Sequence, residues 1–189
     1  MYIELTTALS IAALCVSFYT LWKQRKRLKV VFDDNYIQFN PKEQLWLEEN
    51  RYYIPCEKGI LVGFSLINPG QTPMSVFDLV VISKKQQCKL PFILKHFIPE
   101  TYKNKELKIT ASDDKEYSPE IPDRPSQLVR PGEYFRIDLV ICPEHLDSDD
   151  ILLVSMKATS TSLLHRSKIY PNGNKRIYEA HEKIYKLMV

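Results

Sequence analysis

Glycine is scarce in this chain, which holds only 5 Gly against 12 Pro in 189 residues. The glycine-rich loops that cradle phosphates need several glycines at fixed spacing, and neither G-x-x-x-x-G-K nor G-x-G-x-x-G occurs. The serine-hydrolase pattern G-x-S-x-G and the zinc-protease pattern H-E-x-x-H are also missing. The sequence therefore lacks the common signatures of these enzyme classes. Its prolines suit the loops and strand edges of a β protein.

Cysteines are few and widely separated: Cys15, Cys56, Cys88 and Cys142. No two of them stand in a C-x-x-C spacing. If Cys15 lies in an apolar N-terminal segment, three cysteines remain for the rest of the chain. An odd number fits free thiols in a reducing compartment better than a disulfide framework.

The net charge of +3 comes from one short basic stretch, residues 23–29, which contains Lys23, Arg25, Lys26, Arg27 and Lys29. Apart from these cations and Glu4, the chain carries 21 Lys and Arg against 22 Asp and Glu. A nearly neutral domain lacks the positive surface expected of a nucleic-acid binder. No nucleic-acid partner is therefore expected, and the abundance of Lys, Ile, Tyr and Asn is compatible with an AT-rich bacterial genome.

The N-terminus contains an uncharged run of 18 residues from Leu5 to Trp22. As a helix, this run is roughly 27 Å long, close to the hydrocarbon thickness of a bilayer. Tyr19 and Trp22 fall at its end, where amphipathic rings prefer the membrane interface. The sequence predicts a single transmembrane anchor over residues 1–22, with the lipid bilayer as a partner.

Three other interpretations of this run fit less well. A cleaved signal peptide needs positive charge before the apolar run, but Glu4 is the only charged residue there. A lipoprotein signal needs a small residue before Cys15, and Leu14 occupies that position. A helix packed on a small globular domain normally keeps a polar face toward water, and the unbroken apolar circumference of this run speaks against that interpretation.

The basic stretch after the run predicts the orientation. Lys23, Arg25, Lys26, Arg27 and Lys29 are expected to stay on the cytosolic side, because positive residues flanking a membrane helix are retained there. The few residues before the run are easily exported. The protein is therefore expected in the cell membrane, with its N-terminus outside and its C-terminal domain in the cytosol.

Small and hydroxylated residues are spaced by three or four along the same run and share one helix face: Thr6, Ser10, Ala13, Ser17 and Thr20. Such a face lets membrane helices approach closely, which suggests self-association or packing on a partner protein. The alternative is that these residue types are simply abundant in a weakly hydrophobic helix.

Beyond Lys29, apolar residues alternate with polar ones, as in half-buried strands. The clearest strand is Tyr134–Ile141. Phe135, Ile137, Leu139 and Ile141 are expected to face a core, and Tyr134, Arg136 and Asp138 are expected to face water. A second runs from Ile151 to Ser160. Three more strands are predicted, at Leu28–Phe32, Ile60–Ile67 and Val76–Ile82.

Turn residues separate these strands. The sequences 68–71 (Asn-Pro-Gly-Gln) and 130–133 (Arg-Pro-Gly-Glu) place Pro and Gly as a type II turn requires. Strands joined by such turns, without alternating helices, predict an all-β fold over residues 30–174, an antiparallel immunoglobulin-like β-sandwich. The Cys-Trp-Cys core signature of true immunoglobulin domains is absent.

Two regions are less regular. Residues 84–127 are too long for a hairpin loop, so we expect an insertion with one or two edge strands and an exposed excursion. Residues 175–189 carry Ile177, His181, Ile184 and Met188 at helical spacing, which predicts a short C-terminal helix. Alternatively, Pro171-Asn172-Gly173 closes a hairpin into a strand.

The best local cluster of reactive residues lies between the two clearest strands. Cys142 and His145 precede Asp147, Asp149 and Asp150. Two ligands are too few for structural zinc, and the pattern of a calcium loop is missing. A polar loop is therefore the favoured interpretation. A dispersed enzyme site using Cys142, His145, His165 and nearby acids is the less favoured one.

One aromatic group, Trp46 with Tyr52 and Tyr53, has charged neighbours, as binding surfaces often do. The same residues would equally suit strands that cover the edge of a core. No catalytic residue, metal or cofactor is expected from the sequence. The sequence as a whole favours a non-enzymatic interaction module at the cytosolic membrane face. The alternative is an accessory or assembly subunit of a larger membrane complex.

Overall fold

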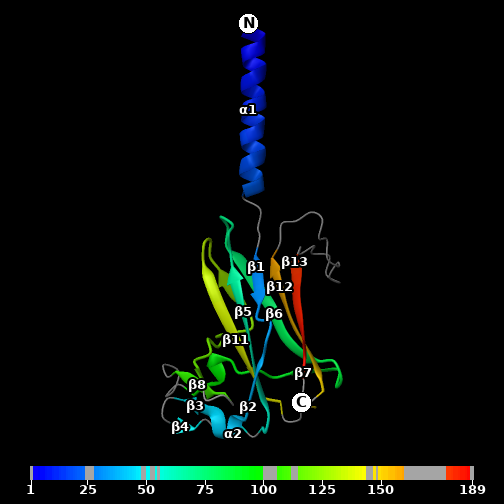
Figure 1. Ribbon diagram of the computed structural model, residues 1–189. Helices are drawn as coiled ribbons and strands as arrows, with labels where there is room; N and C mark the ends of the chain where they lie inside the picture. The colour runs from blue at the N-terminus through cyan, green and yellow to red at the C-terminus, as the bar shows by residue number, and fades with distance from the viewer. Residues whose placement is uncertain are drawn as a thin grey trace.

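The structure is a computed structural model of the whole chain, and it describes residues 2–23, 28–47, 50–51, 54, 56–99, 106–111, 115–143, 147, 149–159 and 178–187. A helix, α1 (Tyr2–Lys23), stands at one end of a body built from β-strands (Figure 1). The described part of the chain is mostly strand, and every strand pair in it is antiparallel. The expectation of an all-β body is therefore confirmed.

The strands form three sheets. Sheet A contains β1 (Lys29–Phe32), β2 (Ile37–Phe39), β5 (Gly59–Ile67) and β11 (Tyr134–Ile141). Sheet B contains β3 (Leu45–Leu47), β4 (Asn50–Arg51), β8 (Leu107–Thr110) and β9 (Glu116–Tyr117). Sheet C contains β6 (Met74–Ser83), β7 (Cys88–Leu90), β10 (Gln127–Val129), β12 (Ile151–Thr159) and β13 (Tyr178–Lys186). Two short helices, α2 (Pro41–Gln44) and η1 (Lys95–Phe97), complete the described elements.

Sheets A and C share the main hydrophobic core. In β11, Ile137, Leu139 and Ile141 are almost fully buried in it, and Phe135 packs against it, as the alternation predicted. From β12, Leu152, Val154, Met156 and Ala158 enter the same core. Each of the five predicted strands is present within one or two residues of its expected ends.

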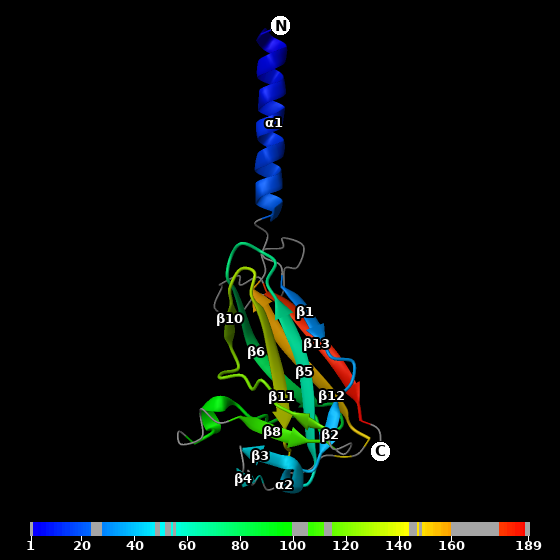
Figure 2. The ribbon, with the colours of Figure 1, turned by 60° about the vertical axis from the view of Figure 1, so that its left-hand side comes forward.

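A second core lies on the other face of sheet A, where the short sheet B covers it. It includes Phe39, Leu45, Leu61, Ile109 and Val140. Figure 2 shows sheet B and α2 at the end of the body opposite to α1. This cover makes β5 and the last residues of β11 buried on both faces.

The expectation that Tyr134, Arg136 and Asp138 all face water is therefore wrong for Asp138. Asp138 is 6% exposed and Val140 is fully buried. Sheet B covers this face, and two further segments lie along the edge of β11. The backbone N–H of Ile93 donates to Val140 O, and the backbone N–H of Asp138 donates to Glu120 O. The covering segments come from distant parts of the chain, so the local alternation does not reveal them.

The two Pro-Gly turns differ. Gly132 has φ +73° and the N–H of Glu133 donates to Arg130 O, as expected for a turn that requires glycine. Gly70 is not among the described residues with positive φ. Instead, its N–H donates to the side chain of Asn68, which is fully buried and also donates to Thr72 O and Val129 O. The type II expectation is thus wrong at 68–71, because a buried Asn side chain fixes that loop.

The C-terminal segment is a strand, so the predicted helix is wrong. β13 pairs with β12 over nine residues, from Ile151 opposite Lys186 to Thr159 opposite Tyr178. Tyr185 and Leu187 enter the main core. Backbone pairing with an exposed sheet edge outweighs a weak helical spacing. The strand agrees with the hairpin alternative, whose turn at 171–173 lies outside the described residues.

The region 84–127 holds more strands than the one or two edge strands expected of it. It contains β7 and the first residue of β10 in sheet C, and β8 and β9 in sheet B. Ile98, Leu107, Ile109 and Ile121 enter the second core. The insertion is therefore part of the hydrophobic structure and not only an exposed excursion.

The predicted N-terminal helix is present. Its described apolar side chains are largely exposed, with Leu9 63%, Val16 63% and Phe18 65% accessible. Among the helices in the described part of the chain, none combines the length and apolarity needed to cross a membrane. The transmembrane character expected for residues 1–22 is therefore not confirmed.

Truncating the core residue Leu139 to Ala is expected to destabilise the protein by about 2–4 kcal/mol, because the side chain is fully buried between sheets A and C. Leu128→Ala is the matched control, since Leu128 is 60% exposed, and it is expected to cost well under about 1 kcal/mol. Urea unfolding followed by circular dichroism measures both. Equal losses for the two variants would contradict the placement of the core.

Candidate functional site: an amphipathic pocket on sheet A

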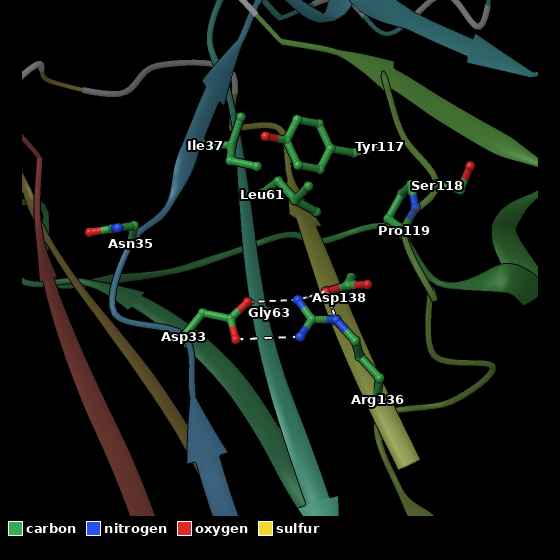
Figure 3. A pocket seen from close by; sticks show the side chains of 10 residues that line it. All are labelled: Asp33, Asn35, Ile37, Leu61, Gly63, Tyr117, Ser118, Pro119, Arg136 and Asp138. Atoms are coloured by element: carbon green, nitrogen blue, oxygen red, sulfur yellow. Dashed lines mark hydrogen bonds and ion pairs between the residues drawn. The ribbon is translucent and has the colours of Figure 1, made fainter. Parts of the chain in front are cut away.

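A pocket of about 230 Å³ opens on the outer face of sheet A, next to the second core. Its floor is formed by β5 and β11, and its walls are the segment that follows β1 and the segment that follows β9 (Figure 3). One end is charged and the other is apolar. The ten lining residues are Asp33, Asn35, Ile37, Leu61, Gly63, Tyr117, Ser118, Pro119, Arg136 and Asp138.

The charged end is built by strand register. Arg136 and Asp138 are two residues apart in β11, so their side chains share the outer face. Asp138 lies opposite Gly63 of β5. On the other side of β5, the N–H of Asp33 donates to Gly63 O over 2.9 Å. The two carboxylates thus flank one glycine in a row across the sheet.

Arg136 bridges the two carboxylates. Its Nη2 lies 2.6 Å from Asp33 Oδ2 and 2.9 Å from Asp138 Oδ1, and its Nε donates to Asp138 Oδ1 over 3.0 Å. Figure 3 shows the guanidinium lying over β5 between the two acids. The hydrogen bond to Asp33 contributes most to raising the pKa of Arg136 above its ordinary value, burial opposes it, and Asp138 adds to it. The guanidinium therefore stays charged.

Gly63 is the position that makes this bridge possible. A Cβ built on Gly63 would collide with Arg136 Nη2, Asp33 Oδ2 and Asp138 Oδ1. Any side chain there would occupy the space that the guanidinium crosses. A glycine inside a strand costs stability, and here it provides the close approach that offsets this cost.

Asp138 is the anchor of the cluster. Its side chain is only 8% exposed, and its Oδ2 accepts a hydrogen bond of 2.9 Å from the N–H of Glu120. The backbones of the two residues also pair, since Asp138 N donates to Glu120 O. The carboxylate thus joins β11 to the segment that carries Ser118 and Pro119.

Asp33 is more accessible, with 38% of its side chain exposed. Its backbone O accepts a hydrogen bond of 2.8 Å from Tyr185 Oη, which comes from β13 in sheet C. Burial raises the pKa of Tyr185, and Asp33 and Asp34 raise it further, so the hydroxyl keeps its proton and donates. The pocket is therefore tied to both large sheets.

The apolar end is made by Ile37, Leu61 and Tyr117, with Pro119 beside them (Figure 3). Ile37 of β2 lies directly opposite Leu61 of β5, and Leu61 belongs to the second core. Ile37 and Tyr117 pack against that core. The pocket thus begins where the second core ends.

This arrangement is suited to binding. The charged groups are held by one another and by backbone groups, and the apolar wall is preformed. Within the described residues, no three His, Cys, Asp or Glu side chains are grouped so that they could hold a metal ion. The lining offers charged groups at one end and apolar side chains at the other.

The residues expected at the membrane interface lie along α1 and just after it. Tyr19 is 58% exposed, and Lys29 is exposed at the start of β1. Trp22 and Lys23 belong to α1, whereas Arg25, Lys26 and Arg27 lie outside the described residues.

The expected helix-packing face is present on α1, with Thr6 and Ala13 on the same side as three hydroxyl residues. Each of these hydroxyls donates to the carbonyl four residues earlier, Ser10 to Thr6, Ser17 to Ala13 and Thr20 to Val16, over 2.8–2.9 Å. This set belongs to α1, whereas the pocket is lined by residues of the β-structured body.

The aromatic group is only partly described. Trp46 is half-buried in β3, between the buried residues Leu45 and Leu47 and opposite Lys108 of β8. Tyr52 and Tyr53 lie outside the described residues. Trp46, the described member of the group, does not line the pocket.

The suggested reactive cysteine lies in a different environment from the one a nucleophile needs. Burial raises the pKa of Cys142, and the neighbouring Cys56 thiol raises it further, which disfavours the thiolate. Cys56 is itself 2% exposed. His145 and His165 lie outside the described residues, so their distance from Cys142 stays untested.

The acidic residues after His145 have structural partners. Asp147 and Asp149 form ion pairs with Lys85 at 3.2 and 2.8 Å. Asp150 is fully buried and accepts hydrogen bonds from the hydroxyl of Ser83 and the N–H of Lys85. These contacts join the turn after β6 to the start of β12, in agreement with a polar loop.

Sequence reasoning missed the pocket, although two signals for it were present. One is a single glycine inside a strongly apolar strand, which often marks a close approach. The other is the pair Arg136 and Asp138 on one strand face. Asp33 carried no local signal, because its partner Arg136 is 103 residues away.

The comparisons with known proteins give no family. No protein-family model matches the chain. No curated protein matches it. Among solved structures, a Bordetella pertussis protein assigned as ApaA is 12% identical, with a TM-score of 0.36, over 87% of this chain and 95% of that one. A likeness at this level carries no argument about function.

Asp138→Ala is expected to destabilise the protein by about 2–4 kcal/mol, because it leaves Arg136 and the N–H of Glu120 without a buried acceptor. Asp123→Ala is the matched control. Asp123 is 73% exposed in a surface ion pair with Lys95, so its loss is expected to cost under about 1 kcal/mol. Chemical denaturation measures both. A neutral Asp138→Ala would contradict the cluster.

Cys142 is expected to react more slowly than Cys88 with iodoacetamide at pH 7, because its pKa is raised and Cys88 is exposed. Mass spectrometry of tryptic peptides at timed intervals gives both rates in the native full-length protein. His145→Ala is expected to leave the Cys142 rate unchanged. A drop of about tenfold or more with the fold intact would indicate a thiolate that His145 sustains, and would favour an enzyme.

Proposed function

We propose that this protein is a non-enzymatic binding module held at a membrane by α1, which presents the pocket of an immunoglobulin-like β-sandwich to the cytosol. The observation that carries the proposal is the exposure of large apolar side chains on α1. The body supplies the binding site, and the helix supplies the attachment.

The exposed residues Leu9, Ile11, Leu14, Val16, Phe18 and Tyr19 project around most of the helix circumference. So much exposed apolar surface on one element is unfavourable in water. Hydrocarbon would cover it on all sides, whereas a groove in one partner protein would cover one face. Although no described helix meets the requirements for a span, this exposure favours insertion into lipid.

The hydroxyls of Ser10, Ser17 and Thr20 also support a lipid environment. Each proton is already donated within the helix, so these side chains need no water as acceptor. The face that they share with Thr6 and Ala13 then offers close packing more than new hydrogen bonds. This face supports the second candidate function, in which α1 self-associates or packs on a larger complex.

The basic stretch supports the orientation. Lys23, Arg25, Lys26, Arg27 and Lys29 follow the apolar run directly, and the chain before the run carries Glu4 and no Lys or Arg. Positive charge of this kind holds its side of a membrane helix in the cytosol and attracts anionic lipid. The body then lies in the cytosol, which suits its three free cysteines, Cys56, Cys88 and Cys142.

Fusion of green fluorescent protein after Val189 tests attachment and orientation together, because this reporter fluoresces in the cytosol and not after bacterial export as an unfolded chain. The fusion is expected to be fluorescent and to stay with the membrane fraction after washing with alkaline carbonate. Deletion of residues 1–23 is expected to move the fluorescence to the soluble fraction.

A fluorescent full-length fusion that is released by carbonate would argue against insertion. A membrane-bound but dark fusion that is present at normal amounts on a blot would argue against the cytosolic orientation. A matched variant with Leu14→Ala and Phe18→Ala is expected to weaken attachment, whereas Ser10→Ala and Ser17→Ala together are not.

A further inference from the structure

The pocket has an excess of negative charge. Two carboxylates, Asp33 and Asp138, face one guanidinium, Arg136, so the three side chains together carry one negative charge. The remaining lining residues are uncharged. An uncompensated charge beside a preformed cavity favours a ligand of the opposite sign.

The two acids are not equivalent. Asp138 is 8% exposed, and both of its oxygens accept hydrogen bonds from Arg136 or Glu120. Asp33 is 38% exposed, and its carboxylate has lone pairs beyond those that face Arg136. Asp33 is therefore the acid that a ligand in the pocket can reach.

An anionic ligand fits this end poorly. The N–H groups of Arg136 already point at Asp33 and Asp138, so a ligand carboxylate or phosphate would have to displace Asp33 and then lie beside it. Like charges at that separation repel each other. The guanidinium thus acts as a bridge that places the acids and not as an anion receptor.

The other end selects an apolar group of limited size. Ile37, Leu61, Tyr117 and Pro119 provide a wall continuous with the second core. The volume of about 230 Å³ is below the range of roughly 300–1,000 Å³ that is usual for drug-sized ligands. A short body, such as one ring on a two-carbon chain, suits this space.

We propose that the pocket binds a small primary amine: a protonated amino group against Asp33 and a short apolar body against Ile37, Leu61 and Tyr117. This rests on the proposed function, because it names the ligand class of the same binding site. The recognition is non-covalent, and the ligand leaves unchanged.

The test uses the full chain in detergent micelles and three probes of similar size: 2-phenylethylamine, neutral 2-phenylethanol and anionic 3-phenylpropionate. Isothermal titration calorimetry is expected to show saturable binding of the amine, at least about tenfold tighter than either other probe, since a charge-assisted hydrogen bond is lost without the ammonium. The neutral probe also measures partition into the micelle.

Asp33→Asn is expected to weaken amine binding about tenfold or more, because it removes the reachable charge and keeps the shape. Asp34→Asn is the matched control. Asp34 is the adjacent acid, but it is 92% exposed, pairs with Lys183 and does not line the pocket. It is expected to change the affinity less than about twofold.

Circular dichroism checks whether Asp33→Asn is folded. A second variant tests the pocket without changing the ionic cluster. Ile37→Ala leaves the ionic cluster intact and shortens the apolar wall, so it is expected to weaken 2-phenylethylamine severalfold. Any one of three results would overturn the proposal. These are tighter binding of 3-phenylpropionate than of the amine, no binding of the amine, or equal losses of amine affinity in Asp33→Asn and Asp34→Asn.

Flotation of the same preparations with liposomes of phosphatidylethanolamine and phosphatidylglycerol tests membrane attachment separately from amine binding. Attachment of the full chain without amine binding would remove the ligand assignment alone. Amine binding that depends on Asp33, in a chain that does not attach to liposomes, would support the ligand and remove the membrane role.

Discussion

The bridge of Arg136 between Asp33 and Asp138 is the interaction on which the site depends. It crosses β5 at Gly63, where a Cβ would collide with all three side chains. Through Asp138 it holds the segment at Glu120, and through the backbone of Asp33 it reaches Tyr185 in sheet C. The contacts of Arg136, Asp33 and Asp138 therefore join four chain segments beside the pocket.

The position of this bridge follows from the unequal cover of sheet A. One face is buried along its length against sheet C, whereas sheet B covers only the end of the other face. Val140 and Leu61 lie under that cover, and the charged cluster lies directly beside it. Charges are tolerated there because each carboxylate has a partner and Asp33 keeps contact with solvent. The pocket is thus amphipathic because it lies at the boundary of the second core.

The protein combines two surfaces of different chemistry. The helix α1 exposes apolar side chains at one end of the molecule, and the body holds a small polar pocket on the side of its β-structure. The buried network around Asp150 and the buried Asn68 stiffen the loops of the body without adding reactive groups to the pocket. The pocket is therefore set in a braced scaffold, which is in keeping with the binding role that we propose.

The sequence by itself determined the local structure: the helix over α1, the strands with clear alternation and the turn at Gly132, since side-chain period and backbone preference act between near neighbours. Only the tertiary structure decided that the outer face of β11 is half buried, that β13 is a strand, and that Asp33 meets Arg136 103 residues away. These outcomes depend on pairing between short, distant segments such as β3 and β8. No local pattern records these contacts, because strands that pair in a sheet can come from distant parts of the chain.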